Sequence, residues 1–375
     1  QSDLRRSIMQ QLTQTDFAKV RPLFAALAHN LTIESILQGL TPGQVWVDDV
    51  AAPETAVCWY GHRLYLAGSA GDPAVQEAFR QLFRDIYIPA AQAQDKNAYV
   101  LHATSAWQQC LPTLLADWQP IARGRLYYRL HGRGHDWTPR LPPGYTLRPV
   151  DAALLADTTL TNLDWVTEEM VSERPSLADF RAKSFGYCLQ HEDKIVAWCM
   201  SEYNTGKRCE LGIATDDAHQ RKGLATAVAN ATIQHALSHD IDDIGWVCWK
   251  DNAASIASAH KLGFTLVDDG SAWFGFFEQV IHLAVQGNLC FQNQDYAGAA
   301  AWYEQALHTD STAPTWVTWN AACAYARLGE TTPAFTYLRQ AVAAGFDDRQ
   351  HLLTSPHWQP YHDTPQWTAI LQSLA

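Results

Sequence analysis

Residues 213–231, IATDDAHQRKGLATAVANA, constrain the fold of this chain more than any other stretch of its sequence. A short apolar run ends near Thr215, a polar loop follows, and an alanine-rich segment comes next. Leu224, Val228 and Ala231 in that segment are spaced i, i+4 and i+7, which is the spacing of one face of a helix. The stretch therefore predicts a strand that leads through a loop into a long helix.

The loop before that helix has the composition of a phosphate-binding site. The backbone N–H groups of residues 221–226 would point into one concave space, with the positive end of the helix dipole behind them. Gly223 and Ala225 are small, so the backbone can approach a diphosphate closely, while Arg221 and Lys222 add positive charge at the rim. The alternative is a charged loop that only caps an amphipathic helix.

The segments around the loop predict a mixed, mostly antiparallel sheet. Apolar runs at 185–190 and 195–203 flank the tetrapeptide HEDK, which is typical of a hairpin turn, and a third run follows at 209–215. After the helix come a further apolar run at 244–249 and a second helical pattern at 252–264. The order is three strands, helix, strand, helix and strand.

A stretch rich in glycine and proline at residues 131–145 predicts a domain boundary. Its Pro142-Pro143-Gly144 sequence can continue neither a helix nor a central strand. Residues 1–132 before it predict a mixed α+β domain that begins with a helix at 17–28 and contains a hairpin turning at YGHR, residues 60–63.

Residues 281–375 predict an all-helical domain with an internal repeat. DYAGAAAWYEQAL, from Asp295, and ETTPAFTYLRQAV, from Glu330, match at an offset of 35 residues. The matched pairs are Ala299 with Ala334, Tyr303 with Leu338, and Ala306 with Ala341. The pattern resembles tetratricopeptide repeats, whose period is near 34; the alternative is a helical bundle without repeats. Two repeats are fewer than the three usually needed, so we expect the last helices to cap the repeats or to pack on another domain.

Composition narrows the function classes. The net charge of −12 argues against a nucleic-acid-binding surface and favours the approach of cationic small molecules. No apolar run approaches the roughly 20 residues that span a bilayer. Eight scattered cysteines without a C-x-x-C pair predict reduced thiols in a cytoplasmic protein, and no H-E-x-x-H or clustered His/Cys spacing predicts a metal site.

Two motifs together resemble the GNAT acetyltransferase superfamily. QRKGLA, residues 220–225, matches the Q/R-x-x-G-x-G/A loop that binds the coenzyme A pyrophosphate, and DNAASIASAHKLGF, residues 251–264, resembles a later motif in which Asn opens a helix closed by Gly-Phe. The resemblance covers residues 144–278 and implies a GNAT-like catalytic domain. It is strongest to the branch that contains zwittermicin A resistance acetyltransferases, which carry an additional N-terminal region. Residues 1–132 would be that region, and a degenerate copy of the same fold is one interpretation of it.

The resemblance implies acetyl-CoA as the donor, with no metal. Ile213 and Thr215 would hold the pantetheine arm, Arg221 through Thr226 would bind the pyrophosphate, and Asn252 would contact the thioester region. Asn252 is also a good helix N-cap. The full set of implied cofactor-binding residues is Ile213, Thr215, Gln220, Arg221, Lys222, Gly223, Leu224, Ala225, Thr226, Asn252 and Ser255.

Carboxylates supply the candidate chemistry on the acceptor side. Glu210, early in the strand predicted at 209–215, is the candidate general base, since burial there would raise its pKa; the alternative is a solvated or salt-bridged glutamate. The candidate acceptor-binding residues are Glu168, Glu169, Glu202 and Trp246, and a solvated helical face is an equal explanation for the first two. Many superfamily members have a Tyr acid where this chain has Ala259, and we expect the adjacent His260 to be a rim residue.

The leading hypothesis is an acetyl-CoA-dependent N-acetyltransferase that acts on a small-molecule amine, for example an antibiotic-like aminopolyol. The amine would attack the thioester directly, without a covalent enzyme intermediate. Two alternatives are an acyl-CoA-binding interaction protein and a protein or peptide acetyltransferase. In both, the repeat domain recruits a peptide or protein partner.

Overall fold

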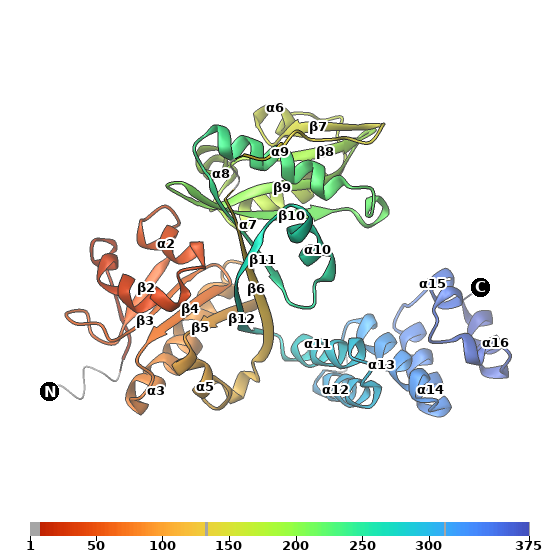
Figure 1. Ribbon diagram of the computed structural model, residues 1–375. Helices are drawn as coiled ribbons and strands as arrows, with labels where there is room; N and C mark the ends of the chain where they lie inside the picture. Colours follow the sequence, from red (N-terminus) through yellow and green to blue (C-terminus); the bar gives the residue numbers. More distant parts are fainter. Residues whose placement is uncertain (1–7, 132–133, 311–312, 375) are drawn as a thin grey trace. The chain divides into compact units, whose positions relative to one another are not determined.

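The computed structural model describes residues 8–131, 134–310 and 313–374 (Figure 1). The chain divides into two compact units, one up to Phe274 and one from Gly275 onward. A mixed sheet flanked by helices forms the first unit, and helices alone form the described part of the second. This confirms the predicted fold class.

The first unit is built on one sheet, in which twelve strands fall within the described residues. The strands are β1 (Gln10–Gln11), β2 (Gln44–Val47), β3 (Thr55–Tyr60), β4 (Arg63–Gly68), β5 (Ala98–Ala103), β6 (Ile121–His131), β7 (Tyr145–Pro149), β8 (Gly186–His191), β9 (Lys194–Thr205), β10 (Arg208–Thr215), β11 (Asp243–Trp249) and β12 (Thr265–Phe276). Their order across the sheet is β1-β2-β3-β4-β5-β12-β6-β11-β10-β9-β8-β7.

The same order of elements occurs twice along this unit. Four antiparallel strands, β1–β4 and β7–β10, are followed in each half by a helix, a strand parallel to the fourth, a second helix and a final strand. The helices are α3 (Pro73–Leu82) and α5 (Ser105–Leu114) in the first half, and α9 (Leu224–Ser238) and α10 (Ala253–Lys261) in the second. The final strands are exchanged, because β12 lies beside β5 and β6 lies beside β11 (Figure 1). The exchange joins the halves into one sheet.

Shorter helices complete the first unit. They are a 3-10 helix (Gln14–Leu27), α2 (Leu31–Leu37), a π-helical turn (Phe83–Tyr87), α4 (Ile88–Gln92), a 3-10 turn (Ala116–Trp118), α6 (Ala152–Leu155), α7 (Leu163–Ser172), α8 (Leu177–Lys183) and a 3-10 turn (Asp217–His219). The helix predicted at 17–28 is thus a 3-10 helix with Pro22 inside it, and proline there cannot donate a backbone hydrogen bond.

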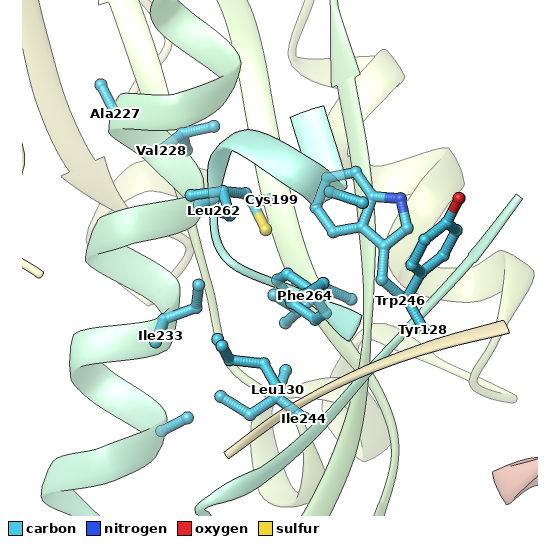
Figure 2. Close-up of a cluster of buried hydrophobic side chains, with 14 of the residues drawn as sticks. Tyr128, Leu130, Cys199, Ala227, Val228, Ile233, Ile244, Trp246, Leu262 and Phe264 are labelled. Carbon is cyan, nitrogen blue, oxygen red and sulfur yellow. The ribbon is translucent and has the colours of Figure 1, made fainter. Parts of the chain in front are cut away.

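A buried cluster fixes α9 and α10 on the second half of the sheet (Figure 2). Val228 and Ile233 of α9 pack with Ile244 of β11, and the ring of Trp246 lies 5.4 Å from that of Phe264, which follows α10. A fully buried aliphatic or aromatic side chain contributes about 1.5–3 kcal/mol each. The cluster therefore holds the start of α9 and of α10 in fixed positions beside β10 and β11.

The predicted hairpin turn and the stretch predicted as a domain boundary both lie in the first unit. The YGHR hairpin is confirmed, because Tyr60 pairs with Arg63 and Gly61 between them has φ 55°. The stretch at residues 131–145 connects β6 to β7 inside the first unit, and its residues 132 and 133 lie outside the described part of the chain.

The second unit consists of consecutive packed helices. They are α11 (Gln279–Gln292), α12 (Tyr296–Thr309), α13 (Thr315–Leu328), α14 (Thr331–Ala343), α15 (Arg349–Thr354), a 3-10 turn (Gln359–Tyr361) and α16 (Pro365–Ser373). All six residues matched in the sequence repeat are buried on α12 and α14. Trp358 and Trp367 pack with Phe335 of α14, so the last helices cap the preceding ones, as expected. Within the described residues, no helix is both long and apolar enough to cross a membrane.

Candidate active site

Strands β10 and β11 separate part-way along their length. They pair in parallel only where Arg208–Glu210 face Asp243–Gly245. Beyond this point β10 continues to Thr215 and β11 to Trp249, and no further pairing joins these two fully described strands. The backbone of residues 211–215 therefore faces an opening, where its N–H and C=O groups can bind a ligand that carries amides.

A cavity of about 260 Å³ occupies this opening. Its walls include β4 and β5 from the first half as well as β9, β10 and β11 from the second. Because β4 and β9 are far apart in the sheet order, the sheet must curve around the cavity. The main polar and aromatic lining residues are Arg63, Tyr65, His102, Arg125, Glu169, Trp198, Glu202, Glu210, Trp246, Asn252 and Ser255.

Three carboxylates from separate elements meet in this cavity. Glu202 of β9 and Glu210 of β10 are direct cross-strand partners, and Glu169 comes from α7. Gly212 makes room for two of them, since a Cβ on this residue would lie 2.0 Å from Oε1 of Glu202 and 3.2 Å from Oε1 of Glu169. Like charges directly opposite each other on a sheet repel, which disfavours full ionisation of the group.

Burial raises the pKa of all three carboxyls. For Glu169, burial and then the charge of Glu173 raise the pKa to about 7. For Glu202, burial followed by the charges of Glu173 and Glu169 places the pKa well above the usual range. Burial also raises the pKa of Glu210. At neutral pH the three groups together therefore retain protons that exposed glutamates would have lost.

Glu210 differs from its neighbours in accepting a hydrogen bond from the backbone of the first half. Its Oε1 accepts from the N–H of Leu31 at 2.8 Å. Leu31 is the first residue of α2, where helix N–H groups have no partner within the helix. This bond and the charge of Arg63 lower the pKa of Glu210 against the effect of burial. Glu210 is thus the best placed of the three to act as an ionised base.

Arg63 of β4 supplies the counter-charge nearest this cluster. Its Nη1 contacts Glu173 and donates to the hydroxyl of Tyr203 at 2.8 Å, and Tyr203 donates to Glu173. Tyr203 has φ 51°, an uncommon value for a residue other than glycine. The charge of Arg63 is therefore neutralised by Glu173 before any ligand enters.

The loop between β10 and α9 folds as the sequence predicts. Arg221 and Gly223 have φ 60° and 81°, and α9 begins at Leu224. The N–H of Ala227 is the first in α9 to donate to a loop carbonyl, that of Gly223, at 3.1 Å. The N–H groups of residues 224–226 before it are those that a helix leaves available to an anion.

The positive φ of residue 223 favours glycine at this position, whereas the surrounding protein would leave room for a side chain. The position of a Cβ on Gly223 is open space, so a side chain there would meet a ligand before it met the protein. Side chains of the loop brace it: Nε2 of Gln220 donates to Asp217 at 2.6 Å, and Nζ of Lys222 donates to the Ala218 carbonyl at 3.2 Å.

The other residues of the predicted donor site divide into those that line the cavity and those, Thr215 and residues 220–226, that are not among its lining residues. Ile213 lines the cavity, and the Thr215 hydroxyl is buried with no hydrogen-bond partner in the described part of the chain. The Leu224 side chain is buried in the core, so only its backbone can serve a ligand. Ala225 and Thr226 are half-buried in the first turn of α9.

Asn252 and Ser255 lie at the start of α10 and line the cavity. The Asn252 side chain accepts from the N–H of Ser255 at 3.0 Å, so it caps the helix. The Ser255 hydroxyl accepts from Nε1 of Trp246, also at 3.0 Å. These bonds fix both side chains at the edge of the cavity that the two residues line.

The predicted acceptor residues divide into two groups. Glu169, Glu202 and Trp246 line the cavity, whereas Glu168 is exposed and lies outside it. One step along a helix turns a side chain by about 100°, which separates Glu168 from its neighbour.

No proton donor stands where many superfamily members have a tyrosine. Ala259 is fully buried, and the exposed His260 packs its ring against Tyr128 at 5.5 Å, as expected of a rim residue. Cys248 lines the cavity, but burial raises the pKa of its thiol, which argues against a nucleophilic thiolate.

Sequence reasoning missed the part of the cavity that the first half provides. Leu31, Arg63, Tyr65, His102 and Arg125 belong to no recognisable motif. Arg63 closes the YGHR turn and Tyr65 lies two residues further along the same strand, and nothing in the local sequence indicates that this strand faces β9 and β10.

A family model described as GNAT acetyltransferase matches residues 21–272. The match spans both halves of the first unit and ends before the second unit begins. The helical second unit is therefore an addition to the matched region.

Two similar proteins agree with this match. The uncharacterized N-acetyltransferase YdfB of Bacillus subtilis is 26% identical over 271 residues, which are 72% of this chain and 99% of the relative. The crystal structure of a GCN5-related N-acetyltransferase-like protein from Streptococcus suis has a TM-score of 0.54 and 21% identity, covering 69% of this chain and 98% of that one. The second likeness shows a shared fold.

Proposed function

This chain belongs to the GNAT acetyltransferase family, and we propose that it transfers an acetyl group from acetyl-CoA to the amine of a small molecule. The observation that carries the proposal is one cavity that joins the unpaired edge of β10 to three carboxylates. Amide-bearing and anionic parts of a donor fit the strand edge and the loop, and a cationic acceptor fits the carboxylates.

The donor side fits acetyl-CoA, which when bound supplies an acetyl group activated as a thioester. The backbone of residues 211–215 would bind the pantetheine amides in the manner of an added strand. The N–H groups of residues 221–226 would hold the pyrophosphate, with Arg221 and Lys222 at its rim. Asn252 would orient the end of the arm from the opposite wall.

On the acceptor side Glu210 would take a proton from the amine. Its bond from Leu31 and the charge of Arg63 favour the ionised form, while burial keeps its pKa above that of a surface carboxyl. A base poised in this way can deprotonate an ammonium group at neutral pH. Glu202 and Glu169 would bind the incoming ammonium and lose protons as it enters.

The test is release of free thiol from acetyl-CoA in the presence of a panel of amines, antibiotic-like aminopolyols included. Glu210→Gln should lower kcat/KM by about 10²–10⁴-fold, the range of general-base catalysis. Glu168→Gln is the matched control, since it changes an exposed glutamate of the same region and should leave kcat/KM unchanged. Binding of acetyl-CoA without turnover on any amine or peptide would overturn the proposal and favour an acyl-CoA-binding interaction protein.

The second unit offers a separate basis for partner recruitment. A groove of about 390 Å³ there is lined by Asn288, Tyr303, Trp319 and Asn320, among others. If it recruits a peptide or protein to be acetylated, deletion of residues 275–375 should lower kcat/KM for that acceptor only. A small-molecule acetyltransferase should keep its kcat/KM after the same deletion. We also infer a cytoplasmic location, since all eight cysteines are unpaired.

A further inference from the structure

Arg125 of β6 lines the cavity and has no charged or hydrogen-bonding partner in the described part of the chain. It forms no ion pair or hydrogen bond there, and its Nε is buried. The guanidinium lies over the ring of Trp249, 4.4 Å from the centroid. Stacking of this kind holds the plane of the group and leaves its in-plane N–H donors for a ligand.

Three other arginines, one lining the same cavity and two on the same strand, are paired, which makes Arg125 the exception among them. The pairs are Arg63 with Glu173, Arg123 with Asp251, and Arg129 with Asp243. Arg123 and Arg129 stand on the same strand as Arg125, at offsets that place all three side chains on one face.

An unpaired cation in a cavity is unfavourable unless a ligand brings the counter-charge. Burial is the main cause that lowers the pKa of Arg125, and the charge of Arg63 acts in the same direction. His102 adds no charge, because burial holds its pKa well below the usual range. Arg63 is paired with Glu173, so Arg125 is the one arginine among the described lining residues that has no paired anion, and its position suits the carboxylate of a ligand.

The unpaired arginine and the carboxylates share one face of the sheet. In the register of the sheet, Arg125 of β6 lies opposite Trp249 of β11. Glu210 of β10 lies opposite Gly245 of the same strand, β11. Four residues along a strand span about 13 Å, and both side chains reach into the space between. The cavity therefore has an acidic end and a basic end.

We propose that the acceptor is a small amino acid, whose carboxylate binds Arg125 while its amine lies at Glu210 and Glu202. This inference rests on the proposed acetyl transfer for the role of the amine. Arg125 would form a charge-assisted pair with the carboxylate, and Glu210 would receive the amine proton. The separation of the two ends favours amino acids whose amine and carboxylate lie several bonds apart.

The experiment compares ω-amino acids of increasing chain length with their uncharged primary amides. For at least one length, kcat/KM should be about 10–100-fold higher for the acid than for the amide, the range of one charge-assisted contact. Arg125→Gln should abolish this preference and leave kcat/KM for the amide nearly unchanged, and Arg125→Lys should restore part of it. Arg123→Gln is the matched control, because Arg123 already pairs with Asp251 and does not line the cavity.

Calorimetric binding of the same compounds separates this inference from the proposed function. Amino acids that bind in an Arg125-dependent way without being acetylated would uphold the carboxylate site and overturn acetyl transfer to them. Acetylation of amines with no difference between acid and amide in binding or turnover would overturn the carboxylate site and leave acetyl transfer standing. Melting temperatures of the Arg125 variants close to that of the unaltered protein exclude misfolding as the cause.

Discussion

Glu169 gives the stability of the first unit a pH dependence with a defined sign. Its pKa is about 7 in the folded chain against an ordinary value of 4.5. A carboxyl with a raised folded pKa contributes stability below its unfolded pKa, and this contribution is lost as the pH rises to the folded pKa. The contribution of Glu169 to the free energy of unfolding should therefore fall by about 1–3 kcal/mol between about pH 4.5 and 7, after discounting for partial exposure.

The comparison of Glu169→Gln with Glu168→Gln isolates this contribution. Urea unfolding across that pH range should show a smaller fall for Glu169→Gln, whereas Glu168→Gln should follow the unaltered protein. Parallel curves for all three proteins would contradict the raised pKa.

Gly223 allows a similarly controlled test of the donor loop. Gly223→Glu places bulk and negative charge where, in the proposed donor site, the N–H groups of residues 221–226 would face a diphosphate, so acetyl-CoA binding should be lost in calorimetry. Gly263 has the same φ of 81° and the same open surroundings, at the end of α10. Gly263→Glu carries the same backbone strain and should still bind. Unchanged affinity in Gly223→Glu would contradict the assignment of the loop.

At the scale of elements, α2 contacts Glu210, the proposed base, through one backbone group. Leu31→Pro removes the N–H that donates to Glu210, at a first helical position where proline is tolerated. Asn30 before it has ψ 100°, which a following proline also accepts. The apparent pKa of the acid limb of the kcat/KM–pH profile should rise by about one unit, because the ionised form of Glu210 loses a hydrogen bond.

Leu31→Ala is the control for the lost side chain, since it keeps the N–H. It should lower the melting temperature without moving the acid limb. If both variants shift the limb equally, packing and not the hydrogen bond sets the pKa of Glu210.

The elements that local sequence specifies were predictable. The run into Thr215, the loop and the helix from Leu224 depend on residues within about twenty positions, and the structure has them as the sequence predicts. The same applies to the hairpin closed by Tyr60 and Arg63. The helix predicted at 17–28 is present from Gln14 to Leu27, and it is a 3-10 helix with Pro22 inside it, a type that the apolar spacing alone does not specify.

The exchange of β6 and β12 was not predictable in this way. Ile244 pairs with Leu130 across more than a hundred residues, and apolar alternation identifies each strand without naming its neighbour. For the same reason Glu202 and Glu210 were found as acidic residues on strands, whereas Arg63 and Arg125 were not connected with them. One half of the cavity was therefore visible in the sequence, and the half supplied by residues before 132 was not.

At the scale of the whole first unit, the exchange predicts how a nicked chain behaves. Residues 134–144 have no helix or strand and are mostly exposed, so a protease can cut there. The fragments should remain together in native gel filtration, because β6 of the first lies between β11 and β12 of the second. They should separate only in denaturant, and separation under native conditions would contradict the strand order.

The position of β12 also sets a delay during protein synthesis. β5 and β6 are complete when residue 131 has been made, but the strand that lies between them ends at residue 276. At roughly 5–20 residues per second, a ribosome needs on the order of ten seconds to supply it. Throughout that interval β5 and β6 of the nascent first half have open edges. These edges must be shielded against pairing with other chains until β12 has been made.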